Sequence, residues 1–174
     1  MTGSSNTIFI FGLGYVGLHL AEQLSRQGWQ IIGTTRTPEN LSDYEQRGWT
    51  ILPFSDDEDV PDLAHHLAGA SALVSTITAI SGRDPVLARH KQAIEGFAGW
   101  TGYVSATSIY PDQAEGWVDE TTIPEPATAR GIARWKAEQE WDEVTGAEIF
   151  RVAGIYGPNR SPFAALRDGR SRLR

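Results

Sequence analysis

The sequence contains no cysteine among its 174 residues. A chain without thiols forms no disulfides, uses no cysteine nucleophile and holds no metal through thiolates, and the redox state of its compartment is left undetermined. The four histidines add little, because His65 and His66 are adjacent and would point in different directions on a helix. We interpret them as a solvated pair and predict no metal site.

Basic charge and long apolar stretches are also scarce. The net charge of −7 argues against a nucleic-acid partner, since phosphate binding needs a basic face. No apolar run approaches the roughly 20 residues that span a bilayer, and residues 1–6 lack the basic start and apolar stretch of a signal peptide. We therefore expect a cytoplasmic protein with no membrane contact. The acidic run 56–59 lacks the alternation of a calcium loop and is interpreted as a charged loop before a helix.

What the chain does contain is a regular alternation of short β-rich runs and longer helical patterns. Hydrophobic periodicity predicts six strands at 8–11, 31–34, 49–52, 72–77, 102–106 and 148–152. It predicts intervening helices at 15–27, 38–47, 61–68, from 85 onward, and 127–144. Strand–helix alternation is typical of parallel sheets with right-handed crossovers. We predict an α/β fold with a doubly wound parallel Rossmann sheet of about six strands. A long loop, 107–126, is expected to lie over a site.

A glycine pattern lies between the first strand and the first helix. Residues 12–17, Gly-Leu-Gly-Tyr-Val-Gly, follow the form G-x-G-x-x-G in the context that gives this motif its meaning. Gly12 would allow the tight turn, Gly14 would let a pyrophosphate approach the backbone, and Gly17 would let the helix pack closely. The N–H groups at the helix start, around Tyr15 and Val16, would bind the anion. The alternative is a glycine-rich turn without a ligand.

The end of the second strand distinguishes two dinucleotides. NAD-specific folds usually place a carboxylate there, whereas this chain has Thr35-Arg36-Thr37. A guanidinium can pair with a 2′-phosphate that a carboxylate would repel. The sequence therefore favours NADP(H) over NAD(H), with Arg36 on the phosphate. Thr35 and Thr37 are weaker phosphate contacts, and Thr76, at the end of the fourth strand, is expected to border the adenosine. A surface arginine without a ligand is the alternative.

Several segments together resemble the short-chain dehydrogenase/reductase superfamily, in its extended and atypical branches of nucleotide-sugar epimerases and dehydratases. They run in the family's order over nearly the whole chain: 11–17, 103–110, 118–121, 126–138 and 151–158. The resemblance implies an NAD(P)-binding domain over 1–174 and an oxidoreductase-type enzyme. It further implies a small-molecule substrate such as a sugar nucleotide, and leaves a homodimer open. Family members continue into a C-terminal substrate domain, so we expect 160–174 to be the start of such a domain or a tail.

The family's catalytic set is altered. Family members use a Ser or Thr after strand five, and a Tyr and Lys four residues apart on the next helix, to exchange a proton with the substrate hydroxyl. The corresponding positions here hold Ala106, Arg130 and Arg134, and moving the frame to Lys136 places Ile132 at the tyrosine. An arginine is a poor acid or base at neutral pH, because its pKa stays above about 12.

No catalytic residue is therefore assigned. The nearby hydroxyls are Ser105, Thr107 and Ser108, although neighbours on a strand point to opposite faces. Arg130 and Arg134 lie one helical turn apart, and form either a cationic face for an anionic ligand or a solvated basic stripe.

Three functions remain open at this point. The first is an NADP(H)-dependent enzyme of the epimerase, dehydratase or reductase kind. The second is a non-catalytic dinucleotide-binding sensor or scaffold, which the altered catalytic set favours. The third, an S-adenosylmethionine-dependent methyltransferase, shares the glycine turn but should carry an acidic residue after strand two, and Arg36 counts against it.

Overall fold

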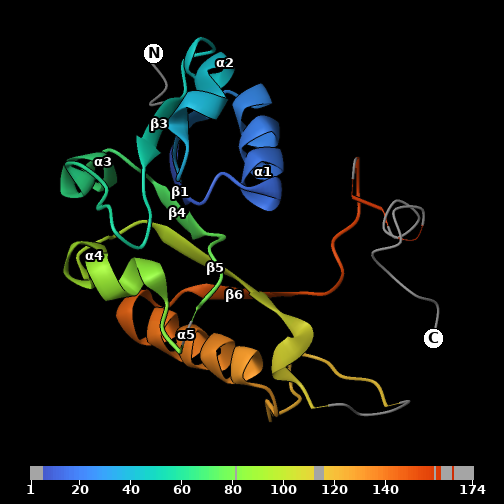
Figure 1. Ribbon diagram of the computed structural model, residues 1–174. Helices are drawn as coiled ribbons and strands as arrows, with labels where there is room; N and C mark the ends of the chain where they lie inside the picture. Colours follow the sequence, from blue (N-terminus) through green and yellow to red (C-terminus); the bar gives the residue numbers. More distant parts are fainter. Residues whose placement is uncertain (1–5, 81, 112–115, 159, 162–165, 167–174) are drawn as a thin grey trace.

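The alternating pattern folds into one parallel sheet with helices on both faces (Figure 1). The computed structural model describes residues 6–80, 82–111, 116–158, 160, 161 and 166. These residues form six strands in the order β3-β2-β1-β4-β5-β6, and every neighbouring pair is parallel. The strands are β1 Thr7–Phe11, β2 Gln30–Thr35, β3 Thr50–Pro53, β4 Ala72–Ser75, β5 Trp100–Ala106 and β6 Glu148–Val152. The predicted doubly wound Rossmann sheet is confirmed.

The helices divide between the two faces of the sheet. They are α1 Tyr15–Arg26, α2 Ser42–Glu45, α3 Leu63–Ala68, α4 Pro85–Glu95 and α5 Ala129–Thr145, with short 3₁₀ segments η1 Pro38–Leu41 and η2 Thr107–Ile109. Figure 1 shows α1 and α2 beside β1–β3, and α3, α4 and α5 on the other side of the sheet. The chain reverses its winding direction between β1 and β4, and a ligand crevice forms at such a reversal in open parallel sheets.

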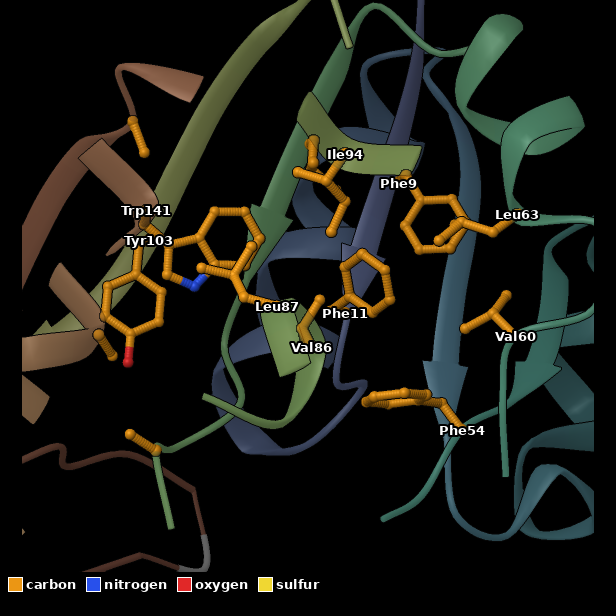
Figure 2. Packing of buried hydrophobic residues seen from close by; sticks show 14 of the residues in the cluster. Phe9, Phe11, Phe54, Val60, Leu63, Val86, Leu87, Ile94, Tyr103 and Trp141 are labelled. Atoms are coloured by element: carbon orange, nitrogen blue, oxygen red, sulfur yellow. The ribbon is translucent and has the colours of Figure 1, made fainter. Parts of the chain in front are cut away.

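The buried central strand β1 supplies both halves of the core. Side chains alternate along a strand, so Ile8 and Ile10 pack toward α1, whereas Phe9 and Phe11 pack toward α3 and α4. All four are at most 3% exposed. Figure 2 shows the second group, in which Phe9 and Phe11 lie among aliphatic side chains from the helices. This apolar strand carries the glycine turn at its carboxyl end.

Two predicted elements are shorter than the sequence suggested, for physical reasons. The predicted helix 38–47 divides into η1 and α2, neither of which contains a buried residue that could hold a longer helix against the core. Strand β4 ends at Ser75 rather than residue 77, because Thr76 turns its hydroxyl to the Gly12 carbonyl, 2.6 Å away.

The remaining predicted elements are found with small shifts at their ends. Asp84 caps α4, accepting the N–H groups of Val86 and Leu87 at 3.0 Å each. The helix predicted from 61 begins at Leu63, and the one predicted from 127 begins at Ala129. In the part of the chain that the structure describes, no helix combines the length and apolarity needed to cross a bilayer.

Candidate functional site

The turn after β1 is fixed by the two strands beside it. The Gly12 N–H donates to the Thr34 hydroxyl at 3.0 Å, and the Leu13 N–H donates to the Thr34 carbonyl at 2.7 Å. From the other side, the Thr76 hydroxyl donates to the Gly12 carbonyl. Thr34 is fully buried, so β2 and the residue after β4 hold the turn as a rigid unit.

The three motif glycines are required for three different reasons. Gly12 has φ +91°, a conformation that other residues rarely adopt. A Cβ on Gly17 would lie 2.1 Å from the Gly12 carbonyl oxygen, so α1 could not approach the turn. Gly14 differs from both, because its φ of −84° suits any residue and its Cβ would meet no described atom within 4 Å. The chain itself does not need a glycine at position 14, whereas a ligand lying against the backbone would.

The amino end of α1, beside Gly14, has backbone N–H groups without hydrogen-bond partners in the helix. The helix is 12 residues long, its N-cap is Gly14, and no side chain caps it in the described structure. Its first N–H groups, which include those of Tyr15 and Val16, therefore lack intrahelical partners. The helix dipole adds partial positive charge at the same place. The Tyr15 side chain points elsewhere, with its hydroxyl 3.3 Å from the Pro158 carbonyl oxygen.

One open cavity of about 360 Å³ joins the glycine turn to the ends of β2, β3 and β4. Of the predicted cofactor residues, Gly12, Gly14, Thr35, Arg36 and Thr76 line it. Sequence reasoning missed its other lining residues, Leu13, Thr34, Phe54, Ser55, Asp56, Ile77, Thr78, Ile80 and Pro85. Among the described lining residues, Arg36 supplies the only basic side chain and Asp56 the only acidic one. Thr37 is exposed outside the lining, and its N–H bonds the Thr35 hydroxyl at 3.3 Å.

A buried histidine supports the wall of this cavity near Phe54. The His90 ring lies against Phe11 and Phe54, with centroids 6.2 and 5.5 Å away, and its Nε2 accepts the Val60 N–H at 3.3 Å. Burial lowers the pKa of His90, against the opposing effect of the nearby Asp59 carboxylate. The lowered pKa favours the neutral ring, which is the form that can accept this hydrogen bond.

The two arginines at the family's Tyr and Lys positions lie in different environments. Arg130 is exposed, whereas Arg134 is only 5% exposed and donates from Nη1 to the Val104 carbonyl at 3.1 Å. The Nε of Arg134 is buried with no hydrogen-bond partner in the described structure. The pair therefore does not form a solvated basic stripe, because one of its members is enclosed between β5 and α5.

The three candidate hydroxyls also differ in their exposure to solvent. Ser105 is 1% exposed, and its hydroxyl has no partner among the described residues. It shares the α5 side of β5 with Tyr103, whose pKa is raised by burial. Thr107 and Ser108 instead lie exposed in η2, past the carboxyl end of β5. Only these two of the three hydroxyls are accessible to a ligand.

A second feature that the sequence did not indicate is an ion pair between a buried carboxylate and a partly buried arginine. Glu138 of α5 is 2% exposed, and its Oε2 accepts from Nη2 of Arg151 at 2.9 Å and from its Nε at 3.1 Å. Arg151 Nη1 donates to the Tyr110 hydroxyl at 2.8 Å, and that hydroxyl donates to the Asp119 carbonyl at 2.9 Å. Burial alone would lower the pKa of Arg151, but its hydrogen bonds to Glu138 and Tyr110 oppose this effect, and the pKa lies above its usual value. These contacts attach the loop after β5 to the core.

Comparison with known proteins agrees with this geometry. The sequence family of the NAD binding domain of 6-phosphogluconate dehydrogenase matches residues 7–124, more than half of the chain. The chain belongs to this family of NAD-binding domains. The matched family is not specific to the short-chain dehydrogenase/reductase superfamily. The resemblance noted in the sequence is therefore confirmed only as far as an NAD-binding Rossmann domain.

Individual relatives are longer than this NAD-binding domain. Protein YeeZ of Escherichia coli K12 is 30% identical, over 89% of this chain and 61% of that protein. A conserved protein of unknown function from Silicibacter pomeroyi is 40% identical with a TM-score of 0.80, over 93% of this chain and 57% of that one. A protein from Methylobacillus flagellatus assigned as an NAD-dependent epimerase/dehydratase is 27% identical with a TM-score of 0.73, over 95% and 59%. The chain thus spans about three fifths of each.

The glycine geometry gives a prediction about folding. We expect Gly17→Ala to lower the free energy of unfolding by about 2 kcal/mol or more, because its Cβ would overlap the Gly12 carbonyl oxygen. Gly14→Ala should leave it within about 0.5 kcal/mol, since the added methyl meets no described neighbour. Urea unfolding of both variants measures this. Equal losses in the two would contradict the assignment of separate roles.

The ion pair between Glu138 and Arg151 gives a second prediction about stability. Glu138→Gln should cost about 3 kcal/mol of unfolding free energy, because it leaves the Arg151 guanidinium without its counter-charge. The matched control is Lys136→Gln, which breaks the exposed pair with Glu140 and should cost less than about 1 kcal/mol. If chemical denaturation gave the two variants the same midpoint, Glu138 would not anchor this part of the NAD-binding domain.

Proposed function

We propose that this NAD-binding domain binds NADP(H), with the diphosphate on the turn 12–17 and the 2′-phosphate at Arg36. The observation that carries the proposal is the single cavity that joins Gly14, the uncapped end of α1 and Arg36. The residues fit the group, because unpaired N–H groups and a glycine without protein neighbours suit a diphosphate, and an exposed guanidinium suits a phosphate monoester.

The threonines around the turn have different roles in this proposal. Thr35 and Thr37 lie beside Arg36 and contact the phosphate more weakly. Thr76 lines the cavity, but its hydroxyl is bonded to the Gly12 carbonyl, so it supports the turn as well as bordering the adenosine. Tyr15 and Val16 contribute their N–H groups, and Gly17 acts by letting α1 pack.

We further propose that the domain serves an oxidoreductase-type enzyme of the epimerase, dehydratase or reductase kind, acting on a small molecule such as a sugar nucleotide. The epimerase/dehydratase relative from Methylobacillus flagellatus supports this reading. Bound NADPH would supply a hydride. Thr107 and Ser108 would orient a substrate hydroxyl, because they are the exposed hydroxyls at the end of β5.

A non-catalytic sensor is the second candidate, and one observation favours it. Arg134 replaces the family's lysine and is bonded to the Val104 carbonyl, while Ser105 is buried, so neither is offered to a substrate.

Several expectations from the sequence stay predictions. They are the single domain over 1–174, the cytoplasmic location, the absence of nucleic-acid and membrane partners, and a homodimer. Of 160–174 the structure describes only residues 160, 161 and 166, so the arginines at 167, 170, 172 and 174 lie outside the described residues.

Calorimetric titration with NADPH and NADH tests the cofactor proposal. Arg36→Gln should weaken NADPH about tenfold or more, because a charge-assisted bond is worth about 1.5–3 kcal/mol, and should change NADH little. Gly14→Ala should weaken both dinucleotides more than tenfold while keeping the fold, since its methyl would occupy the diphosphate's place. The control is Arg26→Gln, which removes an exposed positive charge at the far end of α1. If the Gly14→Ala variant bound NADPH as tightly as the wild type, the proposed diphosphate site on the turn 12–17 would be refuted.

Turnover separates the enzyme from the sensor. With NADPH and a panel of carbonyl compounds that includes 4-keto sugar nucleotides, we expect oxidation of NADPH that falls at least tenfold in the double variant Thr107→Val, Ser108→Ala. NADPH affinity in that variant should be unchanged. Tight NADPH binding with no turnover on any compound would instead support the sensor.

A further inference from the structure

The loop that follows β3 brings negative charge to the cavity that contains Arg36. Strands β2 and β3 pair with Thr35 opposite Pro53, and the Phe54 N–H donates to the Thr35 carbonyl at 3.0 Å. Neighbouring strands lie about 4.8 Å apart, so Arg36 and Phe54 leave the sheet side by side. Asp56 follows two residues later and lines the same cavity as Arg36.

The loop's conformation is fixed by contacts within it and with α4. The Ser55 N–H donates to the Glu58 carbonyl at 3.1 Å, and the Asp57 N–H donates to the Ser55 hydroxyl at 3.2 Å. Arg89 of α4 donates from Nη1 to the Asp56 carbonyl at 2.6 Å and from Nε to Asp59 Oδ1 at 2.5 Å. The backbone of Asp56 is therefore held against α4 while its carboxylate stays exposed.

The loop's four carboxylates are not equally compensated. Arg89 pairs with Asp59, and this hydrogen bond lowers the pKa of that carboxyl. Among the described residues no cation lies within 4 Å of the carboxylates of Asp56, Asp57 or Glu58. Of these three, only Asp56 lines the cavity. Arg89 attracts Asp56 more weakly than it attracts Asp59, so Asp56 brings a negative charge with no ion-pair partner among the described residues to the place where the proposed 2′-phosphate would bind.

We propose that Asp56 is a specificity-determining residue that reduces the preference for NADPH which Arg36 creates. The inference rests on the proposed function and extends it to the loop after β3. A 2′-phosphate carries about −1.5 to −2 charges at neutral pH, and charges within a Debye length of about 8 Å interact across an open site. Arg36 attracts that phosphate and Asp56 repels it, whereas NADH has no charge at this position. The domain thus accepts both dinucleotides, with a modest preference for NADPH.

The test compares Asp56→Asn with the matched control Asp57→Asn, which removes the same charge one residue farther from the cavity lining. The probes are NADPH, NADH and the fragments 2′,5′-ADP and 5′-AMP, and these two fragments differ only at the 2′-phosphate. We expect Asp56→Asn to raise the affinity ratio of 2′,5′-ADP to 5′-AMP about three- to tenfold at 50 mM salt. The change should shrink at 0.5 M salt, and Asp57→Asn should alter the ratio less than about twofold.

A second variant tests the role of Arg89. Arg89→Gln releases Asp59 and adds its uncompensated charge to the loop, so NADPH affinity should fall more than NADH affinity. Equal ratios for Asp56→Asn and the wild type, or an equal loss of both dinucleotides, would overturn the inference while leaving the proposed function in place. A wild-type chain that binds none of the four probes would overturn the proposed function itself.

Discussion

The close approach of α1 to the turn after β1 is the constraint on which the structure depends. Gly17 lies so near the Gly12 carbonyl that no side chain fits between them. This contact sets the helix directly over the sheet's central strand, and Thr34 and Thr76 secure the turn from both sides. The unpaired N–H groups of α1 are consequently aimed at one fixed point above the carboxyl ends of the strands, where an anion gains most from them.

The cavity beside this turn extends from Gly14 to two side chains of opposite charge, Arg36 and Asp56. Arg36 and Asp56 leave neighbouring strands, so in our proposal a balance between them, rather than one residue, would decide the recognition of a ribose phosphate. The other half of the sheet is built differently. Arg134 and Glu138 of α5 are buried and bonded to β5 and β6, and contribute to the stability of the fold. The chain has the geometry of an NAD-binding domain, whereas the proton-transfer residues of the superfamily that its sequence resembles are replaced.

Much of this could be predicted from the sequence, because it depends on local pattern. Six strands, their helices and the conformational roles of Gly12 and Gly17 follow from periodicity and spacing, and the position of Arg36 after β2 predicts its place in the cavity lining. The rest depends on contacts between distant segments. The burial of Arg134, the pairing of Arg151 with Glu138 and the entry of Asp56 into the cavity are set by how β5, β6 and β3 register with their neighbours. No local pattern reports these, and the run 56–59 read simply as a charged loop.

The most direct test is an amide and guanidinium NMR titration of the chain with NADPH and with NADH. Both dinucleotides should shift the backbone N–H signals of Gly14, Tyr15, Val16 and Gly17, because these groups would bond the shared diphosphate. Only NADPH should also shift the Arg36 side-chain signal, since only NADPH carries the 2′-phosphate. Shifts that leave residues 14–17 unchanged, or an Arg36 signal that responds equally to both, would contradict the account.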